Sequence, residues 1–180
     1  VAAMVVSSQA SRFRGVSALC MVVAGGLALG SGVWAMHFVG MLALDLCRAA
    51  GYRVDITALS MVPSVLASTL ALWLLMLKRQ STATLWLGGG LFGLGVGAMH
   101  YSGMLALEGM DGLHFDPLLV VASVVVAVLL AVFALWVRQA LQRWRPGLSA
   151  AWRNAVSGVL MGLAVSAMHY CGMAAVHFTG

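Results

Sequence analysis

Long apolar stretches alternate with short polar connections along the whole chain. Five stretches contain no charged residue and run for about 20 residues or more: 16–44, 57–77, 85–107, 118–137 and 155–176. A helix needs about 20 apolar residues to cross a hydrocarbon core of about 30 Å, so each stretch predicts one transmembrane helix. Pro63 predicts a kink in the second of them. We expect an all-α, polytopic membrane helix bundle that forms a single domain over residues 1–180.

Residues 1–10 predict the inner end of a preceding span. They are apolar at first, become polar from Ser7 to Gln9, and are followed by Arg12 and Arg14. We therefore expect the chain to begin within a helix.

Composition supports a lipid environment. Hydrophobic residues make up 62% of the 180 residues and charged residues only 8%, with a mean hydropathy of +1.00. Soluble domains carry about 25% charged residues, so this chain cannot cover a water-facing surface. The lipid bilayer is its expected partner.

The charged residues divide between alternate connections. Lys and Arg are retained on the cytoplasmic side of a membrane, so the basic connections predict that side. The net charge of +5 is then a sign of topology and does not indicate nucleic-acid binding. The cytoplasmic set is Arg12, Arg14, Lys78, Arg79, Arg138, Arg143, Arg145 and Arg153, and the opposite side has Asp45, Arg48, Arg53, Asp55, Glu108, Asp111 and Asp116.

One segment is repeated three times with the same spacing. Residues 34–44, 97–107 and 166–176 align without gaps around His37, His100 and His169. Two glycines precede each histidine by 11 and 7 residues: Gly26 and Gly30, Gly89 and Gly93, and Gly158 and Gly162. Each unit contains two helices, so successive copies enter the membrane in the same direction. Such parallel repeats are related by an axis along the membrane normal, and three of them predict a pseudo-threefold bundle.

Helical phase relates these repeats to a possible site. At 3.6 residues per turn, both glycines lie within about 20° of the histidine, and a residue four positions later lies about 40° away. Small residues four apart allow close packing of membrane helices, so each histidine face is expected to be buried. A methionine follows each histidine by four residues, and a second one precedes it directly and points about 100° away.

Three intramembrane histidines in matched register favour a metal site. Ionisable residues inside a membrane usually face partners or cavities. Imidazole binds copper, zinc, iron or nickel, whereas a thioether selects soft Cu(I). With no carboxylate in the core, copper is favoured, as Cu(I). The primary candidate ligands are His37, Met41, His100, Met104, His169 and Met173, and the secondary ones are Met36, Met99 and Met168. One shared three-histidine site and separate sites between neighbouring helices are both consistent with the spacing.

The repeated motifs resemble those of the MHYT family of bacterial integral membrane sensor domains. His37, His100 and His169 match the three motif histidines, and the Met-His core and the following Gly-Met are present each time. The fourth residue of the Met-His-Tyr-Thr motif differs in every copy, where Val39, Ser102 and Cys171 replace Thr. In the first copy, Phe38 also replaces Tyr. The resemblance implies a bacterial inner-membrane sensor that holds copper and responds to O2, CO or NO. It also implies cytoplasmic GGDEF and EAL output domains, which make and degrade cyclic di-GMP.

Other functions are consistent with parts of the pattern. A metal-ion or small-solute transporter would need polar residues continuing along the bundle axis, where the sequence has glycines instead. A purely structural anchor would use the histidines as braces, and a copper enzyme would need substrate-handling groups that are not evident. We therefore expect a sensor segment without catalysis, whose histidine motifs lie toward the periplasmic side. Asp45, Glu108, His114 and His177 could form a polar rim there, or be ordinary loop residues.

Overall fold

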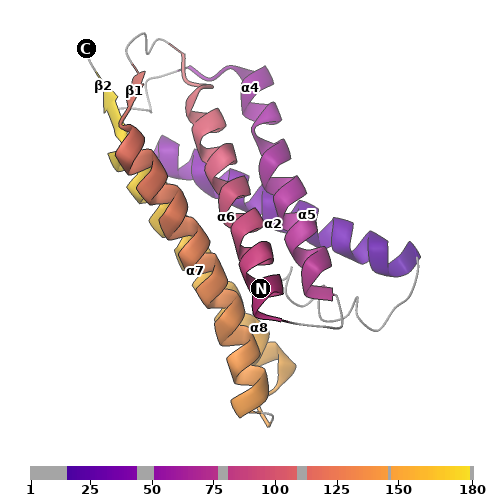
Figure 1. Ribbon diagram of the computed structural model, residues 1–180. Helices are drawn as coiled ribbons and strands as arrows, with labels where there is room; N and C mark the ends of the chain where they lie inside the picture. The colour runs from indigo at the N-terminus through magenta and orange to yellow at the C-terminus, as the bar shows by residue number, and fades with distance from the viewer. Residues whose placement is uncertain (1–15, 44–50, 77–80, 109–112, 146, 179–180) are drawn as a thin grey trace.

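The computed structural model describes residues 16–43, 51–76, 81–108, 113–145 and 147–178. Five helical segments in these ranges are long and apolar enough to cross a membrane, which confirms the expected all-α membrane bundle. The elements are α2 (Val16–Leu42), α4 (Val54–Leu59), α5 (Met61–Met76), α6 (Thr82–Met104), β1 (Leu113–Phe115), α7 (Pro117–Trp144), α8 (Ala150–Ala174) and β2 (Val176–Phe178). Figure 1 shows α5, α6 and α7 next to one another, with α2 crossing behind them at an angle and both strands at one end.

The starts of α6, α7 and α8 follow local capping signals more closely than hydropathy. The Asp116 carboxylate accepts hydrogen bonds from the backbone N–H groups of Leu118 and Leu119 at the start of α7. Ser81 and Ser149 cap α6 and α8 in the same way, as short polar side chains do at helix N-termini. Helix α7 continues to Trp144, well past Arg138, because a helical backbone need not stop where apolar residues do.

The second span consists of two helices, α4 and α5, that meet at Ser60. Proline has no backbone N–H to donate to the carbonyl four residues earlier, and for Pro63 that carbonyl belongs to Leu59, the last residue of α4. At the position of the kink expected from Pro63, the helix is interrupted at Ser60 alone, whose backbone stays in the αR region, so that Val54–Met76 still forms one continuous span.

The three histidine-bearing helices form the inner part of the bundle, and α5 and α7 wedge between them. Helix α5 packs against α2 and α6, and α7 packs against α6 and α8. Hydrogen bonds join these neighbours: the Ser64 hydroxyl of α5 donates to the Gly30 carbonyl of α2 over 3.1 Å. In the same way, Ser157 of α8 donates to the Ala134 carbonyl of α7 over 3.2 Å. The repeated units therefore generate the expected pseudo-threefold arrangement.

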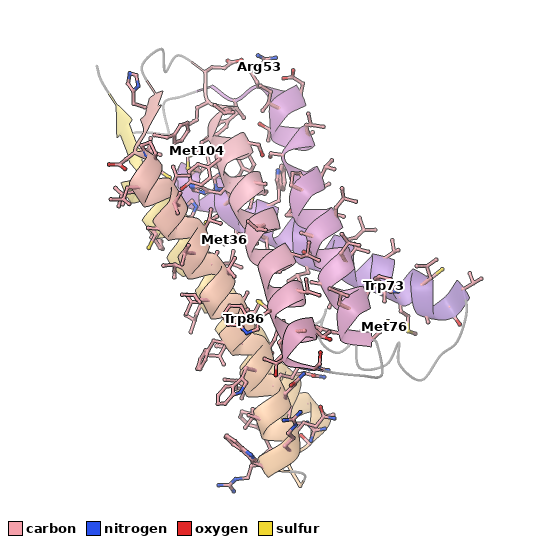
Figure 2. The ribbon with its side chains drawn as sticks, viewed as in Figure 1. Met36, Arg53, Trp73, Met76, Trp86 and Met104 are labelled. Carbon is pink, nitrogen blue, oxygen red and sulfur yellow. The ribbon has the colours of Figure 1, made fainter. Side chains whose placement is uncertain are left out.

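A small β-structure closes one end of the bundle. Strands β1 and β2 pair antiparallel, with His114 opposite His177, and Tyr52 forms an isolated bridge with Leu107. The sequence pattern did not predict these strands, since each has only three residues. Arg53 lies at this end, whereas Trp73 and Trp86 lie toward the other (Figure 2).

Candidate metal centre

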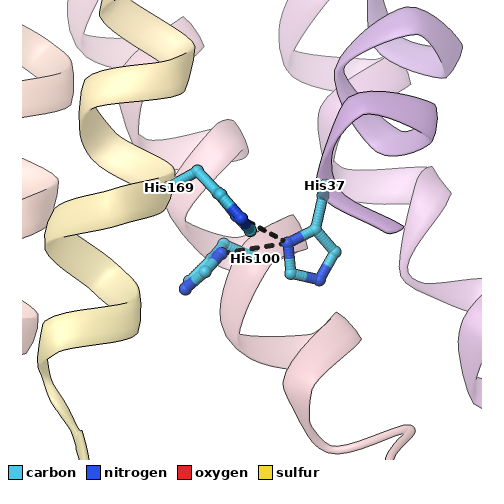
Figure 3. A group of neighbouring side chains, drawn as sticks. All are labelled: His37, His100 and His169. Atoms are coloured by element: carbon cyan, nitrogen blue, oxygen red, sulfur yellow. Dashed lines mark hydrogen bonds between the residues drawn. The ribbon is translucent and has the colours of Figure 1, made fainter. Parts of the chain in front are cut away.

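His37, His100 and His169 meet in the interior of the bundle. They come from α2, α6 and α8, and their side chains are only 1%, 1% and 2% exposed. Figure 3 shows the three imidazoles converging from separate helices. The three histidines therefore form one shared cluster. They are not distributed as separate groups between pairs of helices.

The Nδ1 atoms are the ones that face one another. His37 Nδ1 lies 3.1 Å from His100 Nδ1 and 3.3 Å from His169 Nδ1. The potential ligand atoms of the three residues all lie within 4.8 Å of one another. Nitrogen–metal bonds of about 2.0–2.1 Å in tetrahedral geometry separate ligand nitrogens by about 3.3–3.4 Å. The two spacings around His37 therefore suit a single metal ion, and this group could hold one.

Hydrogen bonding alone does not satisfy this cluster. A neutral imidazole nitrogen carries either one proton or one lone pair, so His37 Nδ1 cannot form full hydrogen bonds with both neighbours. The three Nε2 atoms are also buried and have no hydrogen-bond partner among the described residues. Buried polar atoms are normally hydrogen-bonded, so a cluster with several buried nitrogens that lack hydrogen-bond partners is typical of a binding site.

Each imidazole rests on a glycine of a neighbouring helix. A Cβ placed on Gly103 would lie 2.6 Å from His37 Nε2, one on Gly172 would lie 2.5 Å from His100 Nε2, and one on Gly40 would lie 2.7 Å from His169 Nε2. Each glycine is the third residue after the histidine of its own motif. The contacts therefore run in a cycle, from α2 to α6, from α6 to α8 and from α8 back to α2.

Gly40, Gly103 and Gly172, whose backbones each contact one imidazole and form its seat, are the site residues that the sequence analysis did not predict. Gly40, Gly103 and Gly172 recur at one spacing in every copy of the motif, which was the available signal. Their role was hidden because each glycine serves the histidine of another helix.

The methionines that follow the histidines also gather together. Met41 and Met104 are fully buried and form a cluster with Val176, against which Met173 packs. The side chains of Tyr52, Leu107 and Phe115 cover the cluster from the strand-bearing end. Three thioethers therefore lie in one group, one helical turn beyond the histidines.

The methionines directly before the histidines belong to a different environment. Met99 and Met168 are buried in the main apolar core together with Phe92 and Val96, and Met36 packs against that core. This core occupies the other side of the histidine cluster. The two sets of methionines are thus separated, as their helical phase predicts.

The remaining motif positions do not share one role. The Tyr101 hydroxyl lies 2.7 Å from the Ser123 hydroxyl of α7, Phe38 packs against Trp34 and Tyr52, and Tyr170 is 67% exposed. At the fourth letter, Val39 and Cys171 are exposed, and Ser102 bonds to its own helix at the Ala98 carbonyl. The hydroxyl groups of the family motif therefore have no common place around the histidines.

The suggested polar rim is only partly within the described residues. Glu108 is exposed and its backbone N–H donates to the Gly51 carbonyl over 2.8 Å. The strand register places His114 and His177 opposite each other. Asp45 lies outside the described residues. A continuous rim is therefore still a prediction.

Comparison with known proteins assigns the repeats. Residues 30–89 and 93–151 match the family MHYT, described as a bacterial signalling protein N-terminal repeat. The motif around His169 lies outside both matched segments, although the fold brings it together with the other two. No solved structure matches the chain.

Relatives in several bacteria share most of this chain. The bifunctional diguanylate cyclase/cyclic di-GMP phosphodiesterase MucR of Pseudomonas aeruginosa is 40% identical over 92% of the chain and 24% of its own length. The cyclic di-GMP phosphodiesterase NbdA of the same species is 37% identical over 84% of the chain and 19% of its own length. The signaling protein YkoW of Bacillus subtilis is 27% identical over 91% of the chain and 20% of its own length. The chain thus spans a quarter or less of these relatives.

The repeats, the helices and the three histidine motifs agree with this assignment. The chain belongs to the MHYT family of bacterial signalling proteins.

Proposed function

We propose that this protein is the membrane-embedded sensor segment of a cyclic di-GMP signalling protein and that it holds copper. The observation that carries the proposal is the convergence of three buried Nδ1 atoms with mutual distances of 3.1 and 3.3 Å around His37. With the three protons on Nε2, the three Nδ1 lone pairs point toward one another, and a shared cation would satisfy them together. The histidines would be the primary ligands.

Copper as Cu(I) is the ion that this ligand set favours. The group contains imidazoles and no carboxylate, and the adjoining cluster supplies thioethers of Met41, Met104 and Met173. Soft thioether ligands select Cu(I), whereas carboxylates suit harder ions. The secondary candidates Met36, Met99 and Met168 support the site from the core as packing residues.

The bound ion would supply a soft centre able to take up a diatomic gas such as O2, CO or NO. The chain's own residues provide the surroundings: the histidines hold the ion, and the apolar core beneath them excludes water. Since the ligands come from α2, α6 and α8, any change in their spacing acts on three helices at once. Closely packed helices tend to have discrete arrangements, which allows small shifts to be passed along them.

The signal would act on an output domain elsewhere in the full-length protein. MucR and NbdA carry cyclic di-GMP activities in their names and extend far beyond the matched segment. We infer GGDEF or EAL output domains on the cytoplasmic side of the bacterial inner membrane, and no catalysis in this segment. The basic end of α7 and the start of α8 would face the cytoplasm, with the histidines toward the periplasm.

Two alternatives are less well supported. A channel or transporter would need a polar path, but buried Phe92, Val96 and Val165 fill the core beside the histidines. A structural anchor braced by histidines would have paired their polar atoms, but three buried Nε2 atoms have no partner among the described residues.

The test is the copper content of the full-length protein after loading under reducing conditions. We expect the wild type to retain copper and a variant with His37, His100 and His169 all changed to Ala to lose it. His114→Ala is the matched control, because this exposed histidine of β1 lies outside the cluster.

The outcomes separate the candidate functions. The sensor proposal is supported if the wild type and His114→Ala retain copper while the triple variant loses it but still folds, as judged by circular dichroism. That result would justify titration with a gas, with cyclic di-GMP turnover as the readout. If the wild type holds no copper, or the folded triple variant holds as much, the copper proposal is wrong and the structural anchor is preferred.

A further inference from the structure

Two arginines lie at the same level in α7 and α8, near the end of the bundle opposite the strands. The Ser157 hydroxyl of α8 donates to the Ala134 carbonyl of α7 over 3.2 Å, which sets the register of these two helices. Arg138 lies one turn after Ala134, and Arg153 lies one turn before Ser157. Because the paired helices run antiparallel, both arginines come to one level. Their guanidinium groups are close enough to repel each other.

No carboxylate lies near enough to offset this charge among the described residues. All five acidic residues of the chain fall within 45–55 and 108–116, and the described ones, Asp55, Glu108 and Asp116, lie at the strand-bearing end. Asp116 caps the start of α7, 22 residues before Arg138. At 1.5 Å per residue, that is about 33 Å along the helix.

Most of the hydrogen-bonding capacity of this pair is also unused. A guanidinium group has five N–H donors and no acceptor. One N–H of Arg153 donates to the Leu148 carbonyl, just before α8 begins. Within the described residues, the Arg138 side chain has neither a hydrogen bond nor an ion pair. Both side chains are half-buried, so the fold brings together two positive charges that need an acceptor.

The arginine pair lies at the expected level of the lipid headgroups. Measured from Pro117, the first residue of α7, Arg138 lies 21 residues farther along the chain. That distance is about 32 Å along a helix, and the hydrocarbon core is about 30 Å thick. Trp144 and Trp152 near the pair are exposed, as tryptophans are at a membrane interface. Figure 1 shows α7 and α8 extending beyond α5 and α6 at this end.

We propose that Arg138 and Arg153 bind the phosphate of an anionic phospholipid. Guanidinium groups donate paired hydrogen bonds to phosphate oxygens, and the negative charge of the phosphate offsets the repulsion between the two arginines. The N-terminus of α8, which begins at Ala150, adds partial positive charge at the same end. Exposed apolar side chains of both helices, such as Phe133 and Val159, offer a surface for the acyl chains. A soluble phosphate compound has no use for that surface, which favours the lipid.

This site is separate from the histidine cluster. Arg153 precedes His169 in α8 by 16 residues, which is about 24 Å along the helix. The lipid joins α7 to α8 and does not depend on a bound metal. We therefore expect the stability of the protein to rise when anionic lipid is present, whether or not copper is bound.

Lipid binding is measured by native mass spectrometry of the full-length protein, delipidated in detergent and then supplied with phosphatidylglycerol or phosphatidylcholine. We expect the wild type to retain phosphatidylglycerol in preference to phosphatidylcholine. Arg138→Gln and Arg153→Gln should each weaken this retention about fivefold, the usual contribution of one basic residue beside an anionic membrane. Arg143→Gln is the matched control, because it removes the same charge from an exposed position in the last turn of α7. It should leave the retention nearly unchanged.

Thermal stability gives a second readout in which the expected effects have opposite signs. Without anionic lipid, Arg138→Gln should be at least as stable as the wild type, because the repulsion from Arg153 is removed. With phosphatidylglycerol, the wild type should show the larger increase in thermal midpoint. A variant that is less stable than the wild type without lipid would show that Arg138 has a structural partner, which contradicts the proposal.

Two further outcomes would overturn the lipid site. If Arg143→Gln weakens phosphatidylglycerol retention as much as Arg138→Gln does, or if neither weakens it, the lipid responds to diffuse charge or binds elsewhere. If inorganic phosphate or cyclic di-GMP raises the thermal midpoint as much as phosphatidylglycerol does, the ligand of the arginine pair is a soluble anion.

Discussion

At the scale of single residues, glycine determines where each imidazole can lie. The Nε2 atoms of His37, His100 and His169 contact glycines of the neighbouring helices at distances that leave no space for a methyl group. Filling this space would push the ring toward the centre of the cluster. The glycine seats therefore control the spacing of the Nδ1 atoms on the opposite side of each ring.

Gly103→Ala should disturb the proposed copper site without removing a ligand. The added Cβ would lie 2.6 Å from His37 Nε2, and overpacking of this kind costs about 1–3 kcal/mol. We expect copper affinity to fall about tenfold or more, since each 1.4 kcal/mol is a factor of ten. A competition titration with a Cu(I) chelator measures it. Gly90→Ala is the control, and equal affinities for the two variants would contradict the seating role.

The two sets of methionines should respond differently to substitution. Met104→Leu removes a thioether from the group beyond the histidines, while Met99→Leu changes a residue of the apolar core. Both exchanges nearly conserve volume and should cost less than about 1.5 kcal/mol of stability. We expect only Met104→Leu to weaken Cu(I) binding in the same titration. A larger effect of Met99→Leu would show that the core methionine is the ligand.

At the scale of elements, polar side chains connect helices whose surfaces are otherwise apolar. The Ser64 hydroxyl joins α5 to α2, and Tyr101 joins α6 to α7 through Ser123. Interhelical hydrogen bonds in membranes contribute about 0.6 to 2 kcal/mol. The motif tyrosine of the second repeat thus acts in packing between neighbouring helices.

Tyr101→Phe should lower stability and leave metal binding unchanged. The substitution keeps the ring that packs on Phe115 and removes the hydroxyl at 2.7 Å from Ser123. We expect a loss of about 1 kcal/mol, visible as a lower thermal midpoint in detergent, with full copper content. A large loss of copper would instead make this hydroxyl part of the metal site. Phe38, which already lacks the hydroxyl in the first repeat, argues against that outcome.

At the scale of the whole molecule, the site exists only because three repeats surround one axis. No repeat contains more than one of the motif histidines, and the residues of the cluster are separated by 63 and 69 positions. Each imidazole also depends on the next helix for its seat. The histidine cluster, which is the proposed metal site, and the bundle are therefore formed together.

This arrangement predicts equivalent contributions from the three histidines. His37→Ala, His100→Ala and His169→Ala should each reduce copper content to a similar low level, because a three-nitrogen site loses most of its affinity with any one ligand. The wild type should bind one ion per chain at the histidines, measured by elemental analysis against protein concentration. Stepwise losses of one third would indicate three separate sites and contradict the shared cluster.

Much of the fold could be predicted from the sequence, for reasons that are local. Uncharged stretches such as 85–107 contain enough apolar residues to require a membrane, and the periodic Gly-Gly-His pattern shows which helix face is buried. Capping by Ser81 and Asp116 sets the starts of α6 and α7, three residues and one residue before the apolar stretches begin. The interruption at Ser60, three residues before Pro63, is a local irregularity of one continuous span.

The sequence by itself determined the membrane-spanning helices, the threefold repetition and the candidate ligands, since each depends on composition or on spacing within one helix. Tertiary structure alone decided that the three histidines share one cluster, that their Nδ1 atoms face inward, and that Gly40, Gly103 and Gly172 seat them. It also decided that α5 packs between α2 and α6 and that α7 packs between α6 and α8. The physical reason is that contacts between helices far apart in the chain depend on side-chain packing in three dimensions, which spacing along one helix does not specify.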